Sequence, residues 1–273
     1  MKIDLSTAVG LVAGIIIVSI GIVGNSGELY WFANGISLFV VLGGTLSATL
    51  VNYSMKSLLG LYPVLKNVFT HESYEYQLVI EEIVKKAKIA RKSGVVSLEK
   101  ELNTIDDNFL RNGIELAINE RDSKRLRTFL ALEIDNIERR HASGQEIFFY
   151  MGAYAPAFGM LGTIMGLIIM MENFGGAQIG MQIDTINFNI AEKFAGLLQG
   201  MGLALITTFY GVLFSNLVFL PIGGKLKRKS QDEIMVRNII VEGIMSIHAK
   251  EHPILIHEKL MTFVQESKRP NKD

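Results

Sequence analysis

The sequence predicts an all-α fold: four transmembrane helices, a helical cytoplasmic insert between the second and third, and a helical cytoplasmic tail. The 273-residue chain is 49% hydrophobic and 20% charged, and its charges are distributed unevenly. Four stretches contain no Asp, Glu, Lys, Arg or His: 5–24, 30–51, 147–171 and 194–222. A helix of about 20 residues rises about 30 Å, the thickness of the hydrocarbon layer. No strand-like alternation of apolar and polar residues stands out.

The first apolar stretch follows Lys2 and could be read as a secretory signal. It is longer than a typical signal core, and no convincing small-residue cleavage site follows it. We therefore expect an uncleaved first span. The chain has no cysteine, which excludes disulfides and cysteine-ligated metals. Its net charge of zero gives no reason to expect a nucleic-acid partner.

Basic residues are distributed asymmetrically around the four stretches. The connection 25–29 contains no Lys or Arg, and the connection 172–193 contains only Lys193. The opposite ends are flanked by eight basic residues: Lys56, Lys66, Arg139, Arg140, Lys225, Lys227, Arg228 and Lys229. Because cytoplasmic loops carry the excess of Lys and Arg, we expect both termini and the segment 52–146 in the cytoplasm.

The predicted insert and tail have helical spacing of apolar residues. A first insert helix runs through 78–90, a second is expected to begin near Ser97 and a third near Asp106. From Asp122 the pattern continues without a strong breaker into the third span, which predicts one long helix. The tail 225–250 is also predicted to be helical. The predicted segments are 1–51 with two spans, the 52–146 insert, 147–222 with two spans, and the 223–273 tail.

Small residues recur at every third or fourth position in the last two spans. They are Gly152, Gly159, Thr163 and Gly166 in the third span, and Gly196, Gly200, Ala204, Thr208, Gly211 and Ser215 in the fourth. Such stripes allow helices to approach closely in lipid. Two interpretations remain open: packing within one subunit, or a close-fitting wall for a helix of another chain.

Pro156 lies inside the third span and leaves the Gly152 carbonyl without its helical donor. Thr163 and Thr208 fall near the middle of their spans. Free carbonyls and hydroxyls at that depth can coordinate a hard cation, so we expect the Gly152 carbonyl and the two hydroxyls to contribute to one ion site, although an intramembrane Thr often bonds its own backbone. The four stretches contain no carboxylate, which ion pathways normally include. Either this chain conducts nothing, or a partner helix supplies the acid.

Four motifs resemble the MotA/PomA family of flagellar stator A subunits. The third span reads YAPAFGMLGTIMGLI from Tyr154, and the fourth reads GMGLALITTFYG from Gly200. The insert contains ARKSGVVSLE from Ala90, and Pro221 ends the fourth span. The resemblance covers roughly residues 5–250.

The resemblance implies a multi-pass protein of the bacterial inner membrane that couples inward flow of sodium ions or protons to flagellar rotation. It implies a ring of five copies around a dimer of a B subunit (MotB/PomB type), whose transmembrane helix supplies the missing Asp. The insert would push the rotor protein FliG. A threonine at the position of Thr163 is typical of sodium-driven members, so sodium is favoured.

The resemblance also implies roles for individual residues. Thr163 and Thr208 would line the ion path, Pro156 and Pro221 would couple ion occupancy to movement, and Arg91, Glu99 and Lys92 would contact the rotor. No catalytic residue and no cofactor is expected.

Three alternatives remain. The ExbB/TolQ energisers of outer-membrane transport resemble this chain in the last two spans but have three passes. A membrane enzyme could use His248 and His252, four residues apart, to bind zinc. The position after His248 is not the Glu of the zinc-protease motif, and Pro253 opposes a continuing helix, so we predict no enzyme. The third alternative is a static scaffold without ion flux.

Overall fold

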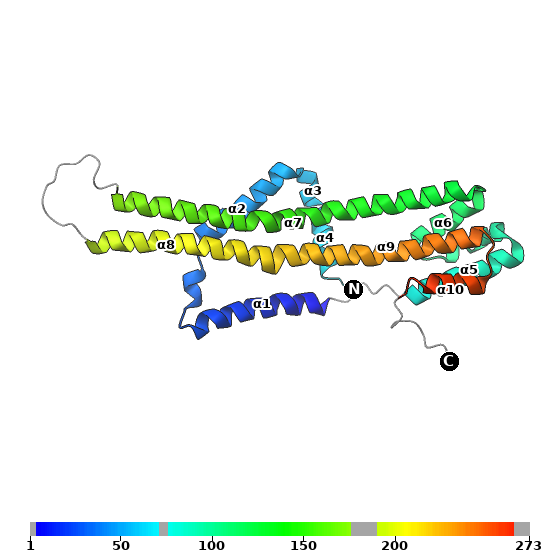
Figure 1. The fold of residues 1–273 in the computed structure, drawn as a ribbon, viewed down its shortest axis with the longest axis horizontal. Coiled ribbons are helices and arrows are strands. Elements are labelled where there is room, and N and C mark those ends of the chain that lie inside the picture. Colours follow the sequence, from blue (N-terminus) through cyan, green and yellow to red (C-terminus); the bar gives the residue numbers. More distant parts are fainter. Residues whose placement is uncertain (1–3, 71–75, 176–189, 265–273) are drawn as a thin grey trace. The chain divides into compact units, whose positions relative to one another are not determined.

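The computed structural model describes residues 4–70, 76–175 and 190–264, and all regular structure within them is helical (Figure 1). Among the described residues, four helices are long and apolar enough to cross a membrane: Leu5–Gly24, Gly35–Asn52, Ser123–Glu172 and Phe194–His248. The predicted all-α class and the four apolar helices are thus confirmed. The chain divides into two compact units. Unit 1 is Met1–His71 with Ser143–Leu226, and unit 2 is Glu72–Ala142 with Lys227–Asp273.

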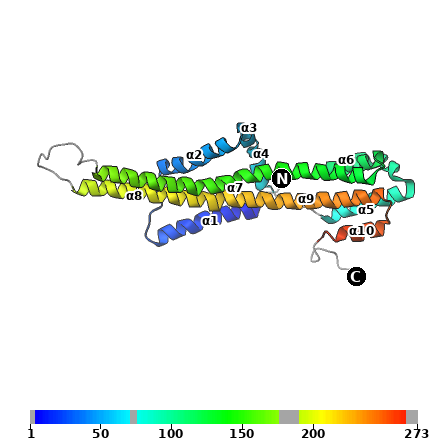
Figure 2. The same cartoon turned by 45° about the horizontal axis from the view of Figure 1, so that its top comes forward.

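Unit 1 contains the apolar helices. Its elements are α1 (Leu5–Gly24), η1 (Leu29–Phe32), α2 (Gly35–Asn52), α3 (Met55–Leu59), α4 (Leu61–Val68), most of the apolar part of α7 (Ser123–Gly175), α8 (Ile190–Leu213), a π-helical turn η3 (Phe214–Phe219) and the start of α9 (Leu220–His248). Figures 1 and 2 show α7 and α8 side by side, with α1 and α2 on opposite sides of the pair. Most of the 172–193 connection lies outside the described residues, as does the side chain of Lys193.

The first helix, α1, has no buried residue. Its large apolar side chains are exposed, Leu5 at 73% and Ile17 at 68%. A compact soluble protein would bury such a helix, whereas a helix facing lipid or another chain leaves it bare. α1 therefore fits a membrane-facing position.

Polar contacts anchor the N-terminal end of α1 within unit 1. Asp4 caps the helix by accepting the Ser6 and Thr7 backbone N–H groups, and the Lys225 ammonium donates to both Asp4 and Thr7. The hydrogen bond from Lys225 is the largest cause that holds the pKa of Asp4 well below its usual range. Asp4 therefore stays ionised and paired with Lys225.

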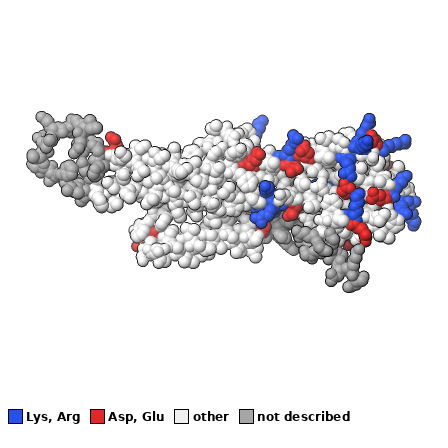
Figure 3. Space-filling view, viewed as in Figure 1, with Lys and Arg blue, Asp and Glu red and all other residues white. Residues whose placement is uncertain are grey.

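Unit 2 is a helical domain with its own core. Its elements are α5 (Tyr76–Ser93), η2 (Val95–Thr104), α6 (Asn108–Asn119), the first part of α7, most of α9 and α10 (Pro253–Met261). Fully buried side chains from each element meet in it, including Ile83, Leu98, Leu110, Leu126, Ile240 and Ile256. On the face drawn in Figure 3, charged side chains are dense over unit 2 and sparse over most of unit 1.

The long helix predicted from Asp122 is confirmed. α7 begins at Ser123, its first turn is capped by the Lys124 N–H donating to Asp122 (2.9 Å), and it runs for 53 residues to Gly175. The helix starts predicted near Ser97 and Asp106 each differ from the structure by two residues: η2 begins at Val95 and α6 at Asn108. η2 is a 3₁₀ helix that begins at Val95, because Gly94 adopts a positive φ of 88° and ends α5 there.

The N-cap of α6 is one residue later than the predicted Asp106. The Leu110 N–H donates to Asp107 at 2.8 Å, so Asp107, and not Asp106, is the N-cap, and the helix begins at Asn108.

Pro221, which we expect at the end of the fourth span, does not interrupt the helix. α8, η3 and α9 follow one another without a break, and Pro221 is the second residue of α9. The π-helical turn before Pro221 bonds the Leu220 N–H to the Ser215 carbonyl, five residues back. This wider turn changes the hydrogen-bond pattern just ahead of the proline, so the helix passes through it. The predicted helical tail, 225–250, is confirmed as far as His248, where α9 ends.

Candidate functional site

The two small-residue stripes pack against each other. A Cβ at Gly211 would lie 2.6 Å from the Ala155 carbonyl oxygen and 3.1 Å from the Pro156 Cα. A Cβ at Gly166 would lie 2.7 Å from the Gly200 carbonyl oxygen. Real side chains do not fit at such distances, so the backbones of α7 and α8 are in direct contact. The first interpretation of the stripes, packing within one subunit, therefore accounts for these glycines.

Thr163 of α7 and Thr208 of α8 meet within this contact. Their hydroxyl oxygens are 2.5 Å apart, and both side chains are half-buried. Thr163 lies 3.1 Å from the Ala204 carbonyl oxygen and 3.2 Å from that of Gly159, and Thr208 lies 3.2 Å from the Ala204 carbonyl oxygen. Each hydroxyl has one proton to donate, so these contacts are alternatives. Four oxygens from two helices thus gather around one point.

The structure corrects the expectation that the Gly152 carbonyl joins the two threonines in one ion site. Gly152 precedes Thr163 by eleven residues, which is about 16 Å along a helix. The Gly152 carbonyl instead accepts a hydrogen bond of 2.6 Å from the buried Ser215 hydroxyl. The carbonyl that Pro156 frees is therefore satisfied within the chain, away from the threonine pair.

Pro156 and Pro221 have different surroundings. Pro156 is half-buried inside α7 against Gly211 of α8. Pro221 is exposed at the start of α9, directly after the π-helical turn. The structure therefore places the first proline in the α7–α8 contact and the second in the first turn of α9.

Thr207 and Tyr210 lie near the α7–α8 contact, and nothing in the sequence indicated that they are functional. Thr207 is buried, and a Cβ at Gly162 would lie 2.5 Å from its Cβ, so it fills the space beside that glycine. The Tyr210 hydroxyl donates to the Phe32 carbonyl and accepts the Asn34 N–H at 3.3 Å, which ties α8 to the start of α2. Tyr210 lies two residues after Thr208, but its partners are 176 and 178 residues away and no sequence motif reveals them.

The three predicted rotor-contact residues lie together in unit 2. Arg91 and Lys92 are in the last turn of α5, Glu99 is on η2, and Gly94 makes the turn between them. All three side chains are exposed, and none forms an ion pair with a described residue. The structure therefore presents two cations and one anion on adjacent elements.

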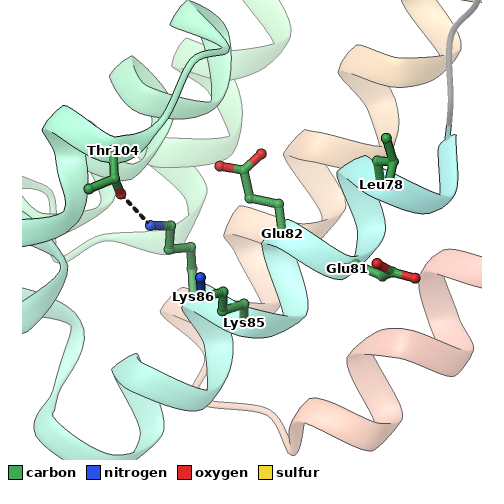
Figure 4. A pocket seen from close by; sticks show the side chains of 6 residues that line it. All are labelled: Leu78, Glu81, Glu82, Lys85, Lys86 and Thr104. Atoms are coloured by element: carbon green, nitrogen blue, oxygen red, sulfur yellow. Dashed lines mark hydrogen bonds between the residues drawn. The ribbon is translucent and has the colours of Figure 1, made fainter.

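Lys86 fastens η2 to α5. Its ammonium is almost fully buried and donates to Glu101 at 3.1 Å and to Thr104 at 2.9 Å, the second contact being drawn in Figure 4. A hollow of about 330 Å³ lies beside it, lined by Leu78, Glu81, Glu82, Lys85, Lys86 and Thr104. The lining has two carboxylates and two ammonium groups, so it favours no single charge of ligand. Lys86 thus holds the element that carries Glu99.

The two histidines of the zinc alternative are used elsewhere. His248 Nε2 lies 2.9 Å from the Glu120 carbonyl oxygen, and His252 caps α10 by accepting the Ile254 N–H at 3.3 Å. Within residues 4–70, 76–175 and 190–264 no group of three or more His, Cys, Asp or Glu side chains could hold a metal ion.

Comparison with known proteins decides the family. Residues 101–239, which are 139 of the 273 residues, match the MotA/TolQ/ExbB proton channel family. The chain is 33% identical over 264 residues to the uncharacterised protein YtxD of Bacillus subtilis, covering 96% of this chain and 91% of that protein. The chain belongs to the MotA/TolQ/ExbB proton channel family.

Relatives that carry motility names match along nearly the whole length. Motility protein A of Borreliella burgdorferi is 31% identical over 255 residues, with 93% of this chain and 91% of that protein covered. Chemotaxis protein PomA of Vibrio alginolyticus is 31% identical over 267 residues, with 97% of each covered. The resemblance to the MotA/PomA members of the family is therefore confirmed.

Solved structures agree on the fold. The chain superposes on a chain of the flagellar MotAB stator complex from Bacillus subtilis with a TM-score of 0.80 and 26% identity, covering 96% of each. For the C. jejuni MotAB structure the TM-score is 0.84 at 23% identity, covering 99% of this chain and 100% of that one.

The segment matched to the family contains Pro156, Thr163, Thr208 and Pro221. The predicted rotor-contact residues, Arg91, Lys92 and Glu99, precede it. The matched segment thus contains the membrane pair α7–α8. The exposed surface of Arg91, Lys92 and Glu99, called here the α5–η2 surface, lies before that segment, in a chain that the full-length relatives match almost completely.

Proposed function

We propose that this chain is the A subunit of a flagellar stator, which couples inward flow of sodium ions or protons to rotation of the flagellar rotor together with a B subunit. The observation that carries the proposal is full-length similarity to motility proteins A and PomA, including α1 and α2 as well as the shared α7–α8 pair. A three-pass ExbB/TolQ-type energiser would lack one of these four apolar helices.

The proposed arrangement places unit 1 in the bacterial inner membrane, with unit 2 and both termini in the cytoplasm. The excess of Lys and Arg at the ends next to unit 2 supports this orientation. Five copies would form a ring around two B subunits. The apolar surface of α1 and the exposed apolar side chains of α7 and α8 are available for lipid, for neighbouring copies and for the B helices.

The proposed ion path requires a carboxylate from the partner. The charge-free stretches of this chain have none, whereas the hydroxyls of Thr163 and Thr208 and the Gly159 and Ala204 carbonyls gather at one point. When an ion arrives on the partner's Asp, the hydroxyls can exchange their mutual bond for contact with that ion or its water. One charge crossing 100 mV releases about 2.3 kcal/mol, enough to drive a modest step between closely fitted helices.

The transported ion is proposed to be sodium, with protons as the alternative. A proton needs a carboxylate and a water path, whereas sodium must replace its hydration shell with several oxygens. The four oxygens at Thr163 and Thr208 suit the second requirement. Removing external sodium at constant proton-motive force should stop rotation, and undiminished rotation would leave protons as the ion.

The proposed output is the exposed α5–η2 surface, where Arg91, Glu99 and Lys92 would contact the rotor protein FliG. The continuity of α7 from unit 2 into unit 1 gives a direct covalent connection between this domain and the ion path.

Partner binding tests the proposal directly. The chain should be co-expressed with a single-pass protein that has an intramembrane Asp and a wall-binding domain, preferably one encoded beside it. We expect a stable detergent-extracted complex with five copies of this chain and two of the partner. If the folded chain never co-purifies with the co-expressed partner, under any condition that retains its fold, the assignment is contradicted.

A further inference from the structure

The helical hydrogen-bond ladder is interrupted once in α7 and once after α8. In α7, Pro156 has no N–H, so the Gly152 carbonyl loses its helical donor. After α8, the turn Phe214–Phe219 is π-helical and contains one residue more than an α-helical path. Within a membrane each freed backbone group needs another partner, and such interruptions are places where helices bend.

One side chain joins the two interruptions. Ser215 belongs to the π-helical turn, is 3% exposed, and donates to the Gly152 carbonyl at 2.6 Å. The helices fit closely on both sides of this bond. A Cβ at Gly211 would be 3.1 Å from the Pro156 Cα, and a Cβ at Gly152 would be 2.6 Å from Leu220 Cδ2. The bond is therefore held in place by packing.

The π-helical turn sets the rotation of α8 about its axis. Each helical residue turns the chain by about 100°, so loss of the extra residue would rotate the preceding part of α8 relative to the start of α9 by about that angle. Thr208 precedes Ser215 by seven residues, about 10 Å. A turn that relaxed would therefore move Thr208 away from Thr163.

We propose that Ser215 is a positioning residue of the ion path, which joins the interruption of α7 at Pro156 to the π-helical turn after α8 and so holds Thr208 against Thr163. The role in ion passage rests on the proposed stator function, whereas the hydrogen bond and its dependence on Pro156 do not. Movement of either helix at its interruption is transmitted to the other through this bond.

A double-mutant cycle isolates the bond, because Pro156→Ala supplies an N–H that can satisfy the Gly152 carbonyl in place of Ser215. Wild type, Ser215→Ala, Pro156→Ala and the double variant are compared as full-length complexes with the partner. In the wild-type background Ser215→Ala should lower the folded-to-unfolded ratio in detergent by about 3- to 18-fold, which corresponds to the average and the largest measured effects of hydrogen bonds between membrane helices. In the Pro156→Ala background the same change should have little effect.

Thr45→Val is the matched control. Thr45 is buried on α2 and its hydroxyl bonds the Val41 carbonyl at 2.6 Å within its own helix. Its effect on unfolding should be the same with Pro156 or Ala at position 156. Equal effects of Ser215→Ala in both backgrounds would overturn the proposed bond.

Rotation speed in a host without its own stator supplies the functional readout. Ser215→Ala should lower the speed and raise the ion concentration needed for half-maximal speed, and Ser215→Thr, which retains the donor, should restore both in part. Wild-type behaviour of Ser215→Ala would overturn the positioning role. If the wild-type complex drives no rotation, the stator assignment is contradicted. The double-mutant cycle measured by unfolding would still test the hydrogen bond between Ser215 and Gly152.

Discussion

Hydroxyl groups are the main polar chemistry of the α7–α8 contact at the scale of single residues. Thr163 and Thr208 face each other, and Thr207 and Ser215 bond backbone carbonyls nearby. A hydroxyl can donate one bond and accept two, so it adapts to an ion, a water or a carbonyl without a fixed charge. An ion path built this way depends on the partner for its charge.

Thr163→Ala should raise the sodium concentration needed for half-maximal rotation speed, if sodium is the ion. Loss of one oxygen ligand worth about 1.4 kcal/mol corresponds to about tenfold. Speed is measured over a sodium series at constant proton-motive force, with Thr45→Val as the control that should leave the requirement unchanged. An unaltered sodium requirement in Thr163→Ala would remove this residue from the path.

Reversal of Arg91 or Glu99 should strongly reduce torque and leave membrane assembly intact, because both side chains are exposed and support no described contact. Like charges brought together at an interface cost several kcal/mol. Opposite-charge changes on the rotor protein should restore part of the torque. Arg125→Glu, an exposed position at the start of α7, is the control with unchanged torque. Normal swimming of the combined Arg91→Glu and Glu99→Lys variant would refute the rotor contact.

At the scale of elements, a shared carboxylate joins three helices of unit 2. Glu242 of α9 bonds Arg127 of α7 at 2.8 Å and Lys259 of α10 at 3.2 Å. Burial alone would raise the pKa of Glu242, but the hydrogen bonds from these two cations outweigh it and lower the pKa below its usual range. The ionised form is therefore the one that holds α10.

Glu242→Gln should release α10 and lower the stability of unit 2 by about 1.5–3 kcal/mol, the range for hydrogen bonds to charged groups. Because the folded pKa is depressed, the contribution is full above the usual carboxyl range near about pH 4 and declines as the pH falls below it. Hydrogen exchange of α10 in the full-length protein should be faster in the variant at pH 7 and equal to wild type in strong acid. Equal exchange at pH 7 would show that Glu242 does not hold α10.

The elements that the sequence predicted correctly are those set by local pattern. The absence of charge identified four apolar helices, and the apolar spacing after Asp122 predicted the uninterrupted α7. Features that depend on the geometry of a turn could not be predicted from the apolar pattern. Gly94 adopts a positive φ that moves the next start to Val95, and the π-helical turn carries the helix through Pro221.

In the candidate site, too, features set by local spacing were predicted and features that depend on the opposite helix were not. The small-residue stripes and the two threonines could be placed on helix faces from spacing alone, and the structure brings Thr163 and Thr208 together. The Gly152 carbonyl was assigned to that group although eleven residues of helix separate them. Ser215 was visible only as a small residue of the stripe, since its role depends on which carbonyl of α7 lies opposite.

At the scale of the whole molecule, the chain combines an apolar unit with no charge in its spans and a charged helical unit. α7 and α9 each contribute residues to both units, so the connections between them are helical and covalent. A subunit that turns ion flow into mechanical work needs both parts: a membrane pair that responds to an ion and a polar domain that transmits movement.

The most direct test of the stator assignment is rotation of tethered cells in a flagellated host that lacks its own stator. The chain is expressed with its B partner, and torque is recorded while the membrane potential is varied. We predict rotation that follows the potential and stops when the partner's intramembrane Asp is replaced by Asn. An assembled wild-type complex in the membrane that produces no torque at any potential, with either sodium or protons available, would contradict the account.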